Sequence, residues 1–494
     1  MIGCDNHMES KEGKTMSTYT KQNGYVRFIS LVNRMMAVAT GMGHDVAADD
    51  ADTLGCLADA VSGNGDIDVT RDWSDMSGAD FANLMSMTRR SQNGRYQLVH
   101  YDQIAAYNNK TLAGTESDGD PFPMWTAYDG LLTELRGIVI DVRDMSVASL
   151  PYYKFRNMGE CDEYSEDAVN RAIAAHGGRF VATEKMDGSL VQMRYVGDGT
   201  AFPNGVLFST SNTISSCTHD AENTHLHLIR TRYMDTDVDS RYVDAAMAYA
   251  DWTLCLELVY PPEDAHVVQY DRSRWGLWLH GMRHVNTGVL ASHDVVQGVG
   301  DRFGIPVVPV VASDDMGTVH RLAHDWRGTD HEGMVLDIGG WLVKVKCEDF
   351  LRLSYMAHTL SAPETENGFR MIEHAMDDGT IDDLVAAYPD SISDRIDDVI
   401  DDIARFRRYA IMYVEDVRQR IPDGCENVHK WVATESGVPK ELLGLVFMGI
   451  DAPDANELSF FAYDVTSHGE RTRQVLSKAD FGKRMSILEK EISR

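Results

Sequence analysis

The stretch Glu184-Lys185-Met186-Asp187-Gly188-Ser189-Leu190 decides the fold prediction, because it places a lysine between two segments that have the composition of strands. Residues 179–183 and 190–195 are rich in β-branched and aromatic residues. The Asp187-Gly188 pair predicts a turn between them, with Lys185 at a strand end. A neutral amine there can attack phosphorus, while the glycine admits a phosphate and the aspartate can hold a ribose hydroxyl. The alternative is a solvated lysine in an ordinary hairpin.

Length and composition indicate a globular chain of several domains. The 494 residues, 43% of them hydrophobic, predict two to four domains. No apolar run approaches the length of a membrane span, and the N-terminus lacks the pattern of a secretory signal. Seven scattered cysteines without a Cys-x-x-Cys pair favour a reducing compartment and argue against a zinc site. We therefore expect a cytoplasmic protein (in the host cytoplasm if the chain is viral), with no membrane association.

The charge of the chain is strongly negative. The formal net charge is −31, and 33 arginines outnumber 13 lysines. Such a chain repels nucleic acid at long range, so a nucleic-acid partner would need a local basic patch. An acidic, lysine-poor surface is also what a protein in molar salt carries. Salt adaptation and a merely acidic mesophilic protein both remain open at this point.

Several charged residues interrupt predicted strands. Residues 96–101, 135–142 and 254–260 have strand composition. Arg136 lies in the second of these, and Lys154 follows in Pro151-Tyr-Tyr-Lys154-Phe. Glu257 lies in the third, where a lone carboxylate between leucines must face a partner or water. Each charge belongs either to a solvated face or to a shared cleft.

Residues 332–346 predict a hairpin around Gly339-Gly340. Lys344 and Lys346 alternate with valines, so both lysines share one face. A strict two-residue turn would pair Lys344 with Val335 and put Glu332 on the opposite face. A longer connection or a bulge would pair Lys344 with Leu336 and bring Glu332 to the lysine face. We expect this second register if the three residues share a site.

The distribution of lysines and the helical tail complete the pattern. Four of the 13 lysines fall in these strand motifs: Lys154, Lys185, Lys344 and Lys346. After about residue 357 the strand patterns stop. Apolar residues between Ile396 and Val417 line one face of a long predicted helix, with aspartates in its first half and arginines in its second, as the helix dipole favours. Further helices are predicted at 442–450 and 471–492.

Taken in order, the motifs resemble the covalent nucleotidyltransferase superfamily of polynucleotide ligases and capping enzymes. These motif sequences are most similar to those of the phage RNA ligase 1 family. They comprise Leu135-Arg136-Gly137-Ile138, Lys154-Phe-x-Asn157, Glu184-Lys185-x-Asp187-Gly188-Ser189, Leu256-Glu257-Leu258-Val259, Glu332-Gly333 and Lys344-Val-Lys346. The resemblance covers residues 95–355 and, more loosely, the helices of 360–450.

The resemblance implies a role for each matching residue. Lys185 would be the nucleophile that becomes lysyl-AMP, with Lys344 and Lys346 as the other catalytic residues. The implied ATP-binding residues are Arg136, Lys154, Glu184, Lys185, Asp187, Gly188, Glu257, Glu332, Lys344 and Lys346. Glu332 and Glu257 would bind the divalent metal, Mg²⁺ or Mn²⁺. One departure is Ser211, which stands where the family carries a lysine.

The chemistry explains why these residue types belong together. A free lysine has a pKa of about 10.4, so few amines are neutral at pH 7. We expect positive charge from Lys344, Lys346 and a bound metal to lower the pKa of Lys185. The same cations would stabilise the charge of the phosphorane transition state.

The sequence therefore predicts an α+β chain in three parts. These are an N-terminal extension (1–94), helical and irregular; a nucleotidyltransferase domain of mixed or antiparallel sheets (95–356), resembling the ATP-grasp-like ligases; and an all-helical C-terminal domain (357–494). The implied activity is ATP-dependent joining of 5′-phosphate and 3′-hydroxyl RNA ends, with tRNA breaks one conceivable target and no obligate protein partner visible. The alternatives are a DNA ligase or a capping-type enzyme, and a non-catalytic nucleic-acid-binding or structural protein that retains the fold.

Overall fold

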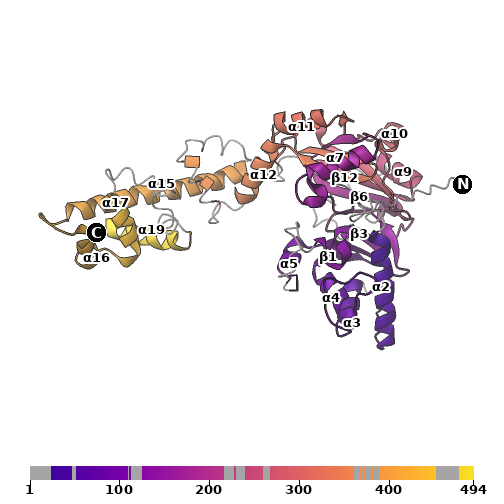
Figure 1. Cartoon of the computed structure of the whole chain (residues 1–494), viewed down its shortest axis with the longest axis horizontal. Coiled ribbons are helices and arrows are strands. Elements are labelled where there is room, and N and C mark those ends of the chain that lie inside the picture. The colour runs from indigo at the N-terminus through magenta and orange to yellow at the C-terminus, as the bar shows by residue number, and fades with distance from the viewer. Residues whose placement is uncertain are drawn as a thin grey trace. The chain divides into compact units, whose positions relative to one another are not determined.

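The computed structural model divides the chain into two compact units (Figure 1). The first comprises Met1–Pro261 with Tyr270–Glu348, and the second comprises Pro262–Gln269 with Asp349–Arg494. The structure describes residues 24–46, 52–109, 111–112, 125–215, 227, 229, 240–259, 267–360, 368, 371–372, 375–376, 381, 390–451 and 478–493.

The first unit contains three antiparallel sheets and the helices that cover them. Its strands are β1 (Thr88–Asn93), β2 (Tyr96–Tyr101), β3 (Arg136–Asp141), β4 (Ser146–Ser149), β5 (Val181–Lys185), β6 (Ser189–Tyr195), β7 (Val206–Thr210), β8 (Trp252–Val259), β9 (Gly276–His284), β10 (Val310–Ser313), β11 (Gly333–Ile338) and β12 (Trp341–Lys346). Its helices are α2 (Gly24–Gly41), α3 (Thr53–Val61), α4 (Gly78–Ser86), α5 (Gln103–Tyr107), α6 (Ala127–Gly130), α7 (Glu166–Ala175), α9 (Arg241–Ala248), α10 (His293–Phe303) and α11 (Met316–Asp325), with 3-10 turns at Leu131–Glu134, Asp162–Tyr164, Pro203–Gly205 and Arg272–Arg274.

Each sheet has four strands and buries one face under helices. The strand orders are β1-β2-β3-β4, β10-β5-β11-β12 and β7-β6-β8-β9. Helices α2, α3 and α4 share a core with the first sheet, α7 and α11 with the second, and α9 and α10 with the third. Alternating apolar residues supply the buried faces, as the period of a strand requires. The faces of the second and third sheets that helices do not cover supply the two walls of a cavity.

The connection between β5 and β6 differs from the predicted hairpin turn. The two strands belong to different sheets: β5 pairs with β10 and β11, while β6 pairs with β7 and β8. Met186 in the connection is buried against Val259 and Val308, so the chain packs inward as it crosses from one sheet to the next. Asp187-Gly188 is therefore a sheet-to-sheet crossing, and Lys185 stands where the two sheets meet.

The N-terminal helices are part of the first unit. Tyr25, Phe28 and Val32 of α2 are buried in a core that also holds Ile138 and Ile140 of β3. The position 94/95, predicted as a boundary, falls in the turn between β1 and β2, which pair as a hairpin. Residues 24–94 thus support the sheet that carries Arg136.

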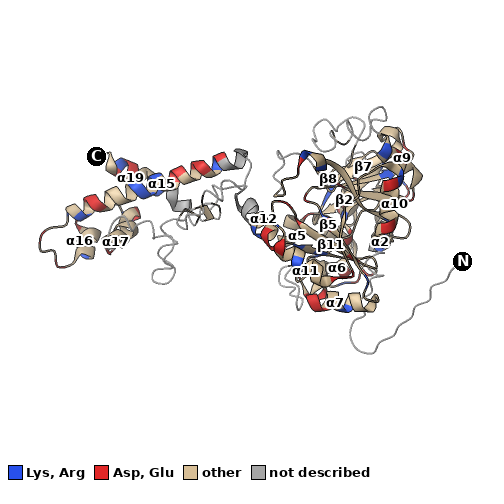
Figure 2. Cartoon of the chain, turned by 90° about the horizontal axis from the view of Figure 1, so that it is seen from above, with Lys and Arg blue, Asp and Glu red and all other residues tan. Residues whose placement is uncertain are grey.

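The described part of the second unit is helical, with α12 (Glu348–Leu360) entering it. It contains α15 (Asp390–Gln419), α16 (Val428–Thr434), a 3-10 turn (Lys440–Leu442), α17 (Leu443–Asp451) and α19 (Lys478–Ile492). Phe406, Val414 and Val417 of α15 pack with Val446 of α17 and Leu488 of α19. Figure 2 shows acidic residues along α15 before the arginines of its later turns.

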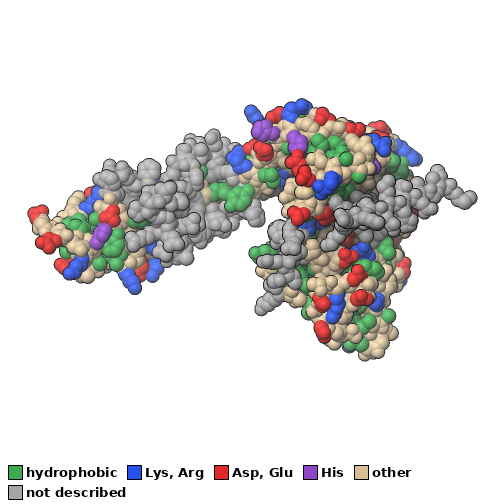
Figure 3. All heavy atoms as spheres, in the orientation of Figure 1, with side chains coloured by type: hydrophobic (Ala, Val, Ile, Leu, Met, Phe, Trp, Pro, Cys, Tyr) green, Lys and Arg blue, Asp and Glu red, His purple; other side chains and the backbone are tan. Residues whose placement is uncertain are grey.

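The α+β prediction, with antiparallel sheets and a helical C-terminal region, is confirmed. Acidic and basic side chains are interspersed on the visible described surface (Figure 3). Among the described helices, none is long and apolar enough to span a bilayer.

One buried ion pair joins parts of the first unit that are distant in sequence. Arg283 of β9 is fully buried and donates to Glu134 Oε1 at 2.7 Å and to the Pro151 carbonyl at 2.8 Å. Its guanidinium also lies over the Tyr25 ring of α2. Burial raises the pKa of Glu134, and the charge of Arg283 opposes that rise.

We predict that Glu134→Ala destabilises the first unit by about 3–5 kcal/mol, because it leaves the Arg283 charge buried without its partner. Urea unfolding followed by circular dichroism measures the change. Arg352→Ala, which removes an exposed i,i+3 pair with Asp349, is the control and should cost under about 1 kcal/mol. Equal effects of the two substitutions would contradict the assignment.

Candidate active site

Two rows of residues that carry the motif lysines cross the free face of the β5-β11-β12 sheet. Pairing places Lys185, Gly333 and Lys346 in the first row, and Thr183, Val335 and Lys344 in the second. Because side chains alternate along a strand, the lysines at 185, 344 and 346 all project from this one face. The sheet thereby gathers three of the four motif lysines on a single wall.

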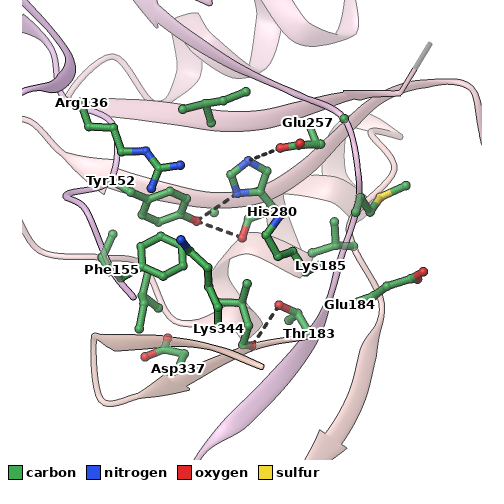
Figure 4. A pocket seen from close by; sticks show the side chains of 18 of the residues that line it. Arg136, Tyr152, Phe155, Thr183, Glu184, Lys185, Glu257, His280, Asp337 and Lys344 are labelled. Atoms are coloured by element: carbon green, nitrogen blue, oxygen red, sulfur yellow. Dashed lines mark hydrogen bonds and ion pairs between the residues drawn. The ribbon is translucent and has the colours of Figure 1, made fainter. Parts of the chain in front are cut away.

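The opposite wall comes from the β7-β6-β8-β9 sheet. Leu190, Glu257 and His280 face the same cavity, whose volume is about 630 Å³. Figure 4 shows Lys344 and Thr183 on one side and the Glu257–His280 pair on the other, with Arg136, Tyr152 and Phe155 closing one end. The cavity thus lies between the two sheets that the Met186–Gly188 crossing connects.

Glu332 holds two of the lysines together. Its Oε2 lies 2.5 Å from Lys185 Nζ, and its Oε1 lies 2.9 Å from Lys346 Nζ. The carboxylate side chain is only 4% exposed, so these ion pairs are shielded from water. One carboxylate therefore fixes both amines at the same end of the cavity.

The hairpin register differs from the one predicted for a shared site. Lys344 pairs with Val335, as in a strict two-residue turn, and Glu332 nevertheless reaches both lysines. The reason is Gly333, whose φ of 149° is a conformation that glycine alone adopts readily. The backbone rotates there, so Glu332 lies beyond the regular strand and escapes its alternation. Gly333 also carries no side chain between Lys185 and Lys346.

The electrostatic state of Lys185 is the reverse of the one predicted. Burial lowers the pKa of Lys185, but the charges of Glu332, Glu257 and Asp187 and the hydrogen bond to Glu332 outweigh it, and the pKa lies above the usual value. The amine is therefore protonated and paired without a ligand. The expected cationic influence of Lys344 and Lys346 does not dominate, because Glu332 is closer.

Lys344 has the opposite shift. Burial, followed by the charges of Arg136, Lys154 and Lys185, lowers its pKa to about 6. Its Nζ lies 5.0 Å from the centre of the Phe155 ring, and Arg136 lies against the same ring. Arg136 Nη1 is buried without a hydrogen-bond partner. Lys344 and Arg136 thus form a positively charged end of the cavity. Neither makes an ion pair within the described structure, and together they could bind a phosphate group.

Two predicted ATP-binding residues, Lys154 and Asp187, lie outside the cavity lining. Lys154 Nζ stands 4.7 Å from the Trp125 ring centre and 5.4 Å from that of Tyr101, itself a cavity residue. Asp187 donates its backbone N–H to the Tyr270 hydroxyl and does not line the cavity, whereas Gly188 does.

Glu184 borders the cavity, but its carboxylate points away from it (Figure 4). The carboxylate accepts two hydrogen bonds from Arg274, at 3.1 and 2.7 Å, and lies 3.0 Å from His331 Nδ1. Alternation along β5 explains this, since Lys185 and Thr183 occupy the cavity side. Glu184 therefore anchors the strand that presents Lys185.

Glu257 is a half-buried carboxylate that faces the cavity. Burial raises its pKa to about 7, opposed by the charge of Lys185. Among the described residues, no group of three His, Cys, Asp or Glu side chains could hold a metal ion. Glu257 and Glu332 fit Mg²⁺ or Mn²⁺ as part of a ligand set, because Mg²⁺ sites commonly combine one or two carboxylates with substrate phosphates and water.

Other cavity residues were not anticipated from the sequence. Thr183, Tyr152, His280, His100 and Tyr101 line the cavity, and no motif marked them. Ser211 also lines it and offers a hydroxyl where the resemblance led us to look for a lysine. Trp278, considered for base stacking, is absent from the lining; it is half-buried and packs against the cluster that contains Met186, rather than lying fully in a core.

Comparison with known proteins addresses the family. Residues 134–351 match the family model described as RNA ligase. The recognition of an RNA ligase family is thereby confirmed over these residues, which supply all of the cavity lining except His100 and Tyr101. No curated protein sequence matches the chain.

Solved RNA ligases show a distant likeness to the chain. Two forms of an archaeal ATP-dependent RNA ligase match with TM-scores of 0.36 and identities of 13% and 14%, over 56% and 58% of this chain and 62% and 65% of theirs. A Naegleria gruberi RNA ligase with PPi matches with a TM-score of 0.30 and 13% identity, over 40% of this chain and 56% of its own. The chain thus spans less than two thirds of each of these solved chains.

We predict that polyphosphate binding takes up a proton on Lys344. With a pKa of about 6 in the free protein, this amine is mostly neutral at pH 7.5, and a bound phosphate raises its pKa. Affinity should therefore fall as pH rises above about 6. Calorimetry with ATP at pH 7.5, in buffers of different ionisation enthalpy, measures the uptake. Lys344→Arg should bind without uptake, and unchanged uptake in Lys344→Met would contradict the assignment.

We also predict that Gly333→Ala costs about 1–3 kcal/mol of stability, because an added Cβ would lie 2.3 Å from the Val345 carbonyl in a backbone conformation reserved for glycine. Urea unfolding again measures the cost. Gly444→Ala is the control, since its Cβ meets nothing within 4 Å and its helix favours alanine. A Gly333 variant as stable as wild type would contradict the role given to that backbone.

Proposed function

We propose that this chain is an ATP-dependent RNA ligase that acts through Lys185. In the first step, Lys185 Nζ attacks the α-phosphorus of ATP, a nitrogen–phosphorus bond forms, and pyrophosphate leaves. In the second, AMP passes from Lys185 to an RNA 5′-phosphate. In the third, an RNA 3′-hydroxyl displaces AMP and the strand is sealed.

The observation that carries the proposal is the cluster of Lys185, Glu332 and Lys346 at one end of a nucleotide-sized cavity. A buried amine in such a cavity, beside further cations, has the attributes of a nucleophile that works on a phosphate. The RNA ligase match over residues 134–351 supports the same reading.

Each residue then has a chemical task. Lys185 must lose a proton before it attacks, and Glu332 Oε2, at 2.5 Å, is placed to receive it. Lys346 and Lys344 would stabilise charge that develops on the α-phosphate, and Arg136 the charge of the outer phosphates. Glu332, Glu257 and the phosphates would hold Mg²⁺ or Mn²⁺, which when bound neutralises the triphosphate and competes with Lys185 for Glu332.

The remaining parts of the proposal concern further nucleotide-binding residues, the choice of RNA and the compartment. Gly188 lines the cavity, Lys154 lies over the ring of Tyr101, a lining residue, and Asp187 adjoins Gly188, so we keep all three among the nucleotide-binding residues. We propose that the helical C-terminal region contributes to the choice of RNA, with tRNA breaks as one candidate substrate, and that RNA is the only macromolecular partner required. We place the reaction in the cytoplasm, since the described cysteines are free thiols.

We predict that incubation with α-³²P-labelled ATP and Mg²⁺ or Mn²⁺ labels the wild-type chain covalently and leaves Lys185→Ala unlabelled. Lys346→Met should lower the labelling rate by about 10²–10³-fold, the cost of removing a group that stabilises transition-state charge. Lys430→Met, in α16, is the matched control and should label normally. A salt series guards against inactivity of so acidic a chain in dilute buffer.

The same assay separates the alternatives. Label from GTP alone would identify a capping-type enzyme, and no label at any salt would favour a non-catalytic binding protein. For the sealing steps, a 5′-³²P-labelled RNA should become phosphatase-resistant, whereas sealing of DNA alone would identify a DNA ligase.

A further inference from the structure

A β-bulge at Gly137 decides from which face of the first sheet Arg136 projects. Ile138 pairs with Val99 and Arg136 pairs with His100, so Gly137 is an extra residue on β3. Ile138 is buried in the core that this sheet shares with α2, α3 and α4. Residues two apart on a regular strand share a face, so without the extra residue Arg136 would point into that apolar core. The bulge moves Arg136 to the opposite face of the sheet.

The opposite face leads into the cavity. Arg136 lines the cavity, and so does His100, its partner on β2. Figure 4 shows the Arg136 guanidinium beside Tyr152, pointing into the cavity. Arg136 Nη1 is buried and has no hydrogen-bond partner within the described structure. The backbone of Gly137 therefore determines whether this guanidinium is available to an anion in the cavity.

Gly137 adopts a backbone conformation that few other residues tolerate. Its φ is +92°. A Cβ at this position would lie 3.2 Å from Gln192 Nε2 and 3.2 Å from the Ser211 carbonyl oxygen, so neighbouring segments pack closely on the bulge. Because the extra residue of a bulge falls outside the regular ladder, its carbonyl needs another donor. Gln192 of β6 supplies this donor, with Nε2 2.6 Å from the Gly137 oxygen.

Ser149 of β4 fixes the orientation of the Gln192 amide. Both side chains are fully buried, and the Ser149 hydroxyl lies 2.6 Å from Gln192 Oε1. The Gly137 carbonyl can only accept, so the amide presents its NH₂ group to that carbonyl and its oxygen to Ser149, which donates. Thr253 Oγ1, 3.3 Å from the Ser149 oxygen, can donate to it in turn. A buried network with satisfied members is rigid, and this one holds the bulge in place.

We propose that Gln192 is a positioning residue for ATP binding: through the Gly137 carbonyl it holds Arg136 where the outer phosphates of ATP bind. The inference rests on the proposed use of ATP. It adds a residue that lies outside the cavity lining and in none of the sequence motifs. Because Gln192 acts through Arg136, its effect is confined to the polyphosphate part of the nucleotide. The competing role is a purely structural one, in which Gln192 joins the first and third sheets and influences no ligand.

The test compares ATP with AMP, which lacks the outer phosphates, by equilibrium dialysis at fixed Mg²⁺ against full-length Lys185→Ala, which cannot be consumed by labelling. Gln192→Met keeps the side-chain length but removes both hydrogen bonds. Added to this background, it should weaken ATP about 5–10-fold and AMP less than about twofold. Arg136→Met should weaken ATP about 10–100-fold, again selectively. The double variant should bind ATP as Arg136→Met does, because the two residues act as a unit.

Gln97→Met is the matched control. Gln97 of β2 is as buried as Gln192, but its hydrogen bonds join Asp52 and Leu54 instead of the bulge. This variant should unfold at a lower urea concentration and keep the ratio of ATP to AMP affinity. If Gln192→Met does not fold, Ser149→Ala replaces it. That substitution frees the Gln192 amide to turn and should weaken ATP about 2–5-fold, with AMP unchanged.

The contrary outcomes are distinct. Equal weakening of ATP and AMP by Gln192→Met, an unchanged ATP affinity, or a further loss when it is added to Arg136→Met would overturn the proposal. Covalent labelling of the chain with Lys185 intact separates this inference from the ligase function. If Lys185 takes label while Gln192→Met leaves the ratio of ATP to AMP affinity unchanged, the ligase function stands and this inference fails. ATP-selective weakening in a chain that never takes label would leave the positioning role standing and remove the catalytic function.

Discussion

The carboxylate of Glu332, shared between Lys185 and Lys346, is the constraint on which the site depends. Three adjacent strands must supply the two lysines and the glycine between them, and the backbone at Gly333 must take a conformation closed to other residues. Because the carboxylate is buried, its attraction for both amines is little screened by water. The arrangement keeps Lys185, the proposed nucleophile, in place, and it also keeps this amine protonated until a ligand changes the local charge.

Charge is distributed unevenly for a chain with a net charge of −31. Two other arginines of the first unit are paired with carboxylates: Arg283 with Glu134 and Arg274 with Glu184. Arg136 and Lys344 have no such carboxylate in the described structure, and they stand together against Phe155. An anion that enters the cavity therefore meets local positive charge inside an acidic protein. This is the local basic patch that the composition required of a nucleic-acid or nucleotide partner.

The sequence predicted the elements well and their partners less well. Strand composition located β2, β3, β5, β6 and β8, and apolar spacing located α15, because both signals are local. The partners of β5 are β10 and β11, more than 100 residues later, and nothing near Asp187 reveals that the chain changes sheets there. The hairpin register was misjudged because alternation was extended through Gly333, where the backbone departs from strand geometry. The bulge at Gly137 escaped notice because a bulge exists only once two strands have paired.

The pKa values of Lys185 and Lys344 shift in opposite directions, and this difference suggests how ligand binding could activate the cavity. Lys185 and Lys344 are both half-buried in the same wall, and this burial acts to lower the pKa of each. Glu332 reverses the effect for Lys185, whereas at Lys344 the charges of Arg136, Lys154 and Lys185 outweigh that of Glu160. Without a ligand, the cavity therefore holds a neutralised nucleophile and an amine that has shed its proton. A bound phosphate would favour protonation of Lys344. A cation that binds Glu332 would break the ion pair between Glu332 and Lys185. On this reasoning, binding of the substrate and its cation frees Lys185, the proposed nucleophile, from Glu332. In the absence of the substrate, Lys185 stays protonated and paired with Glu332.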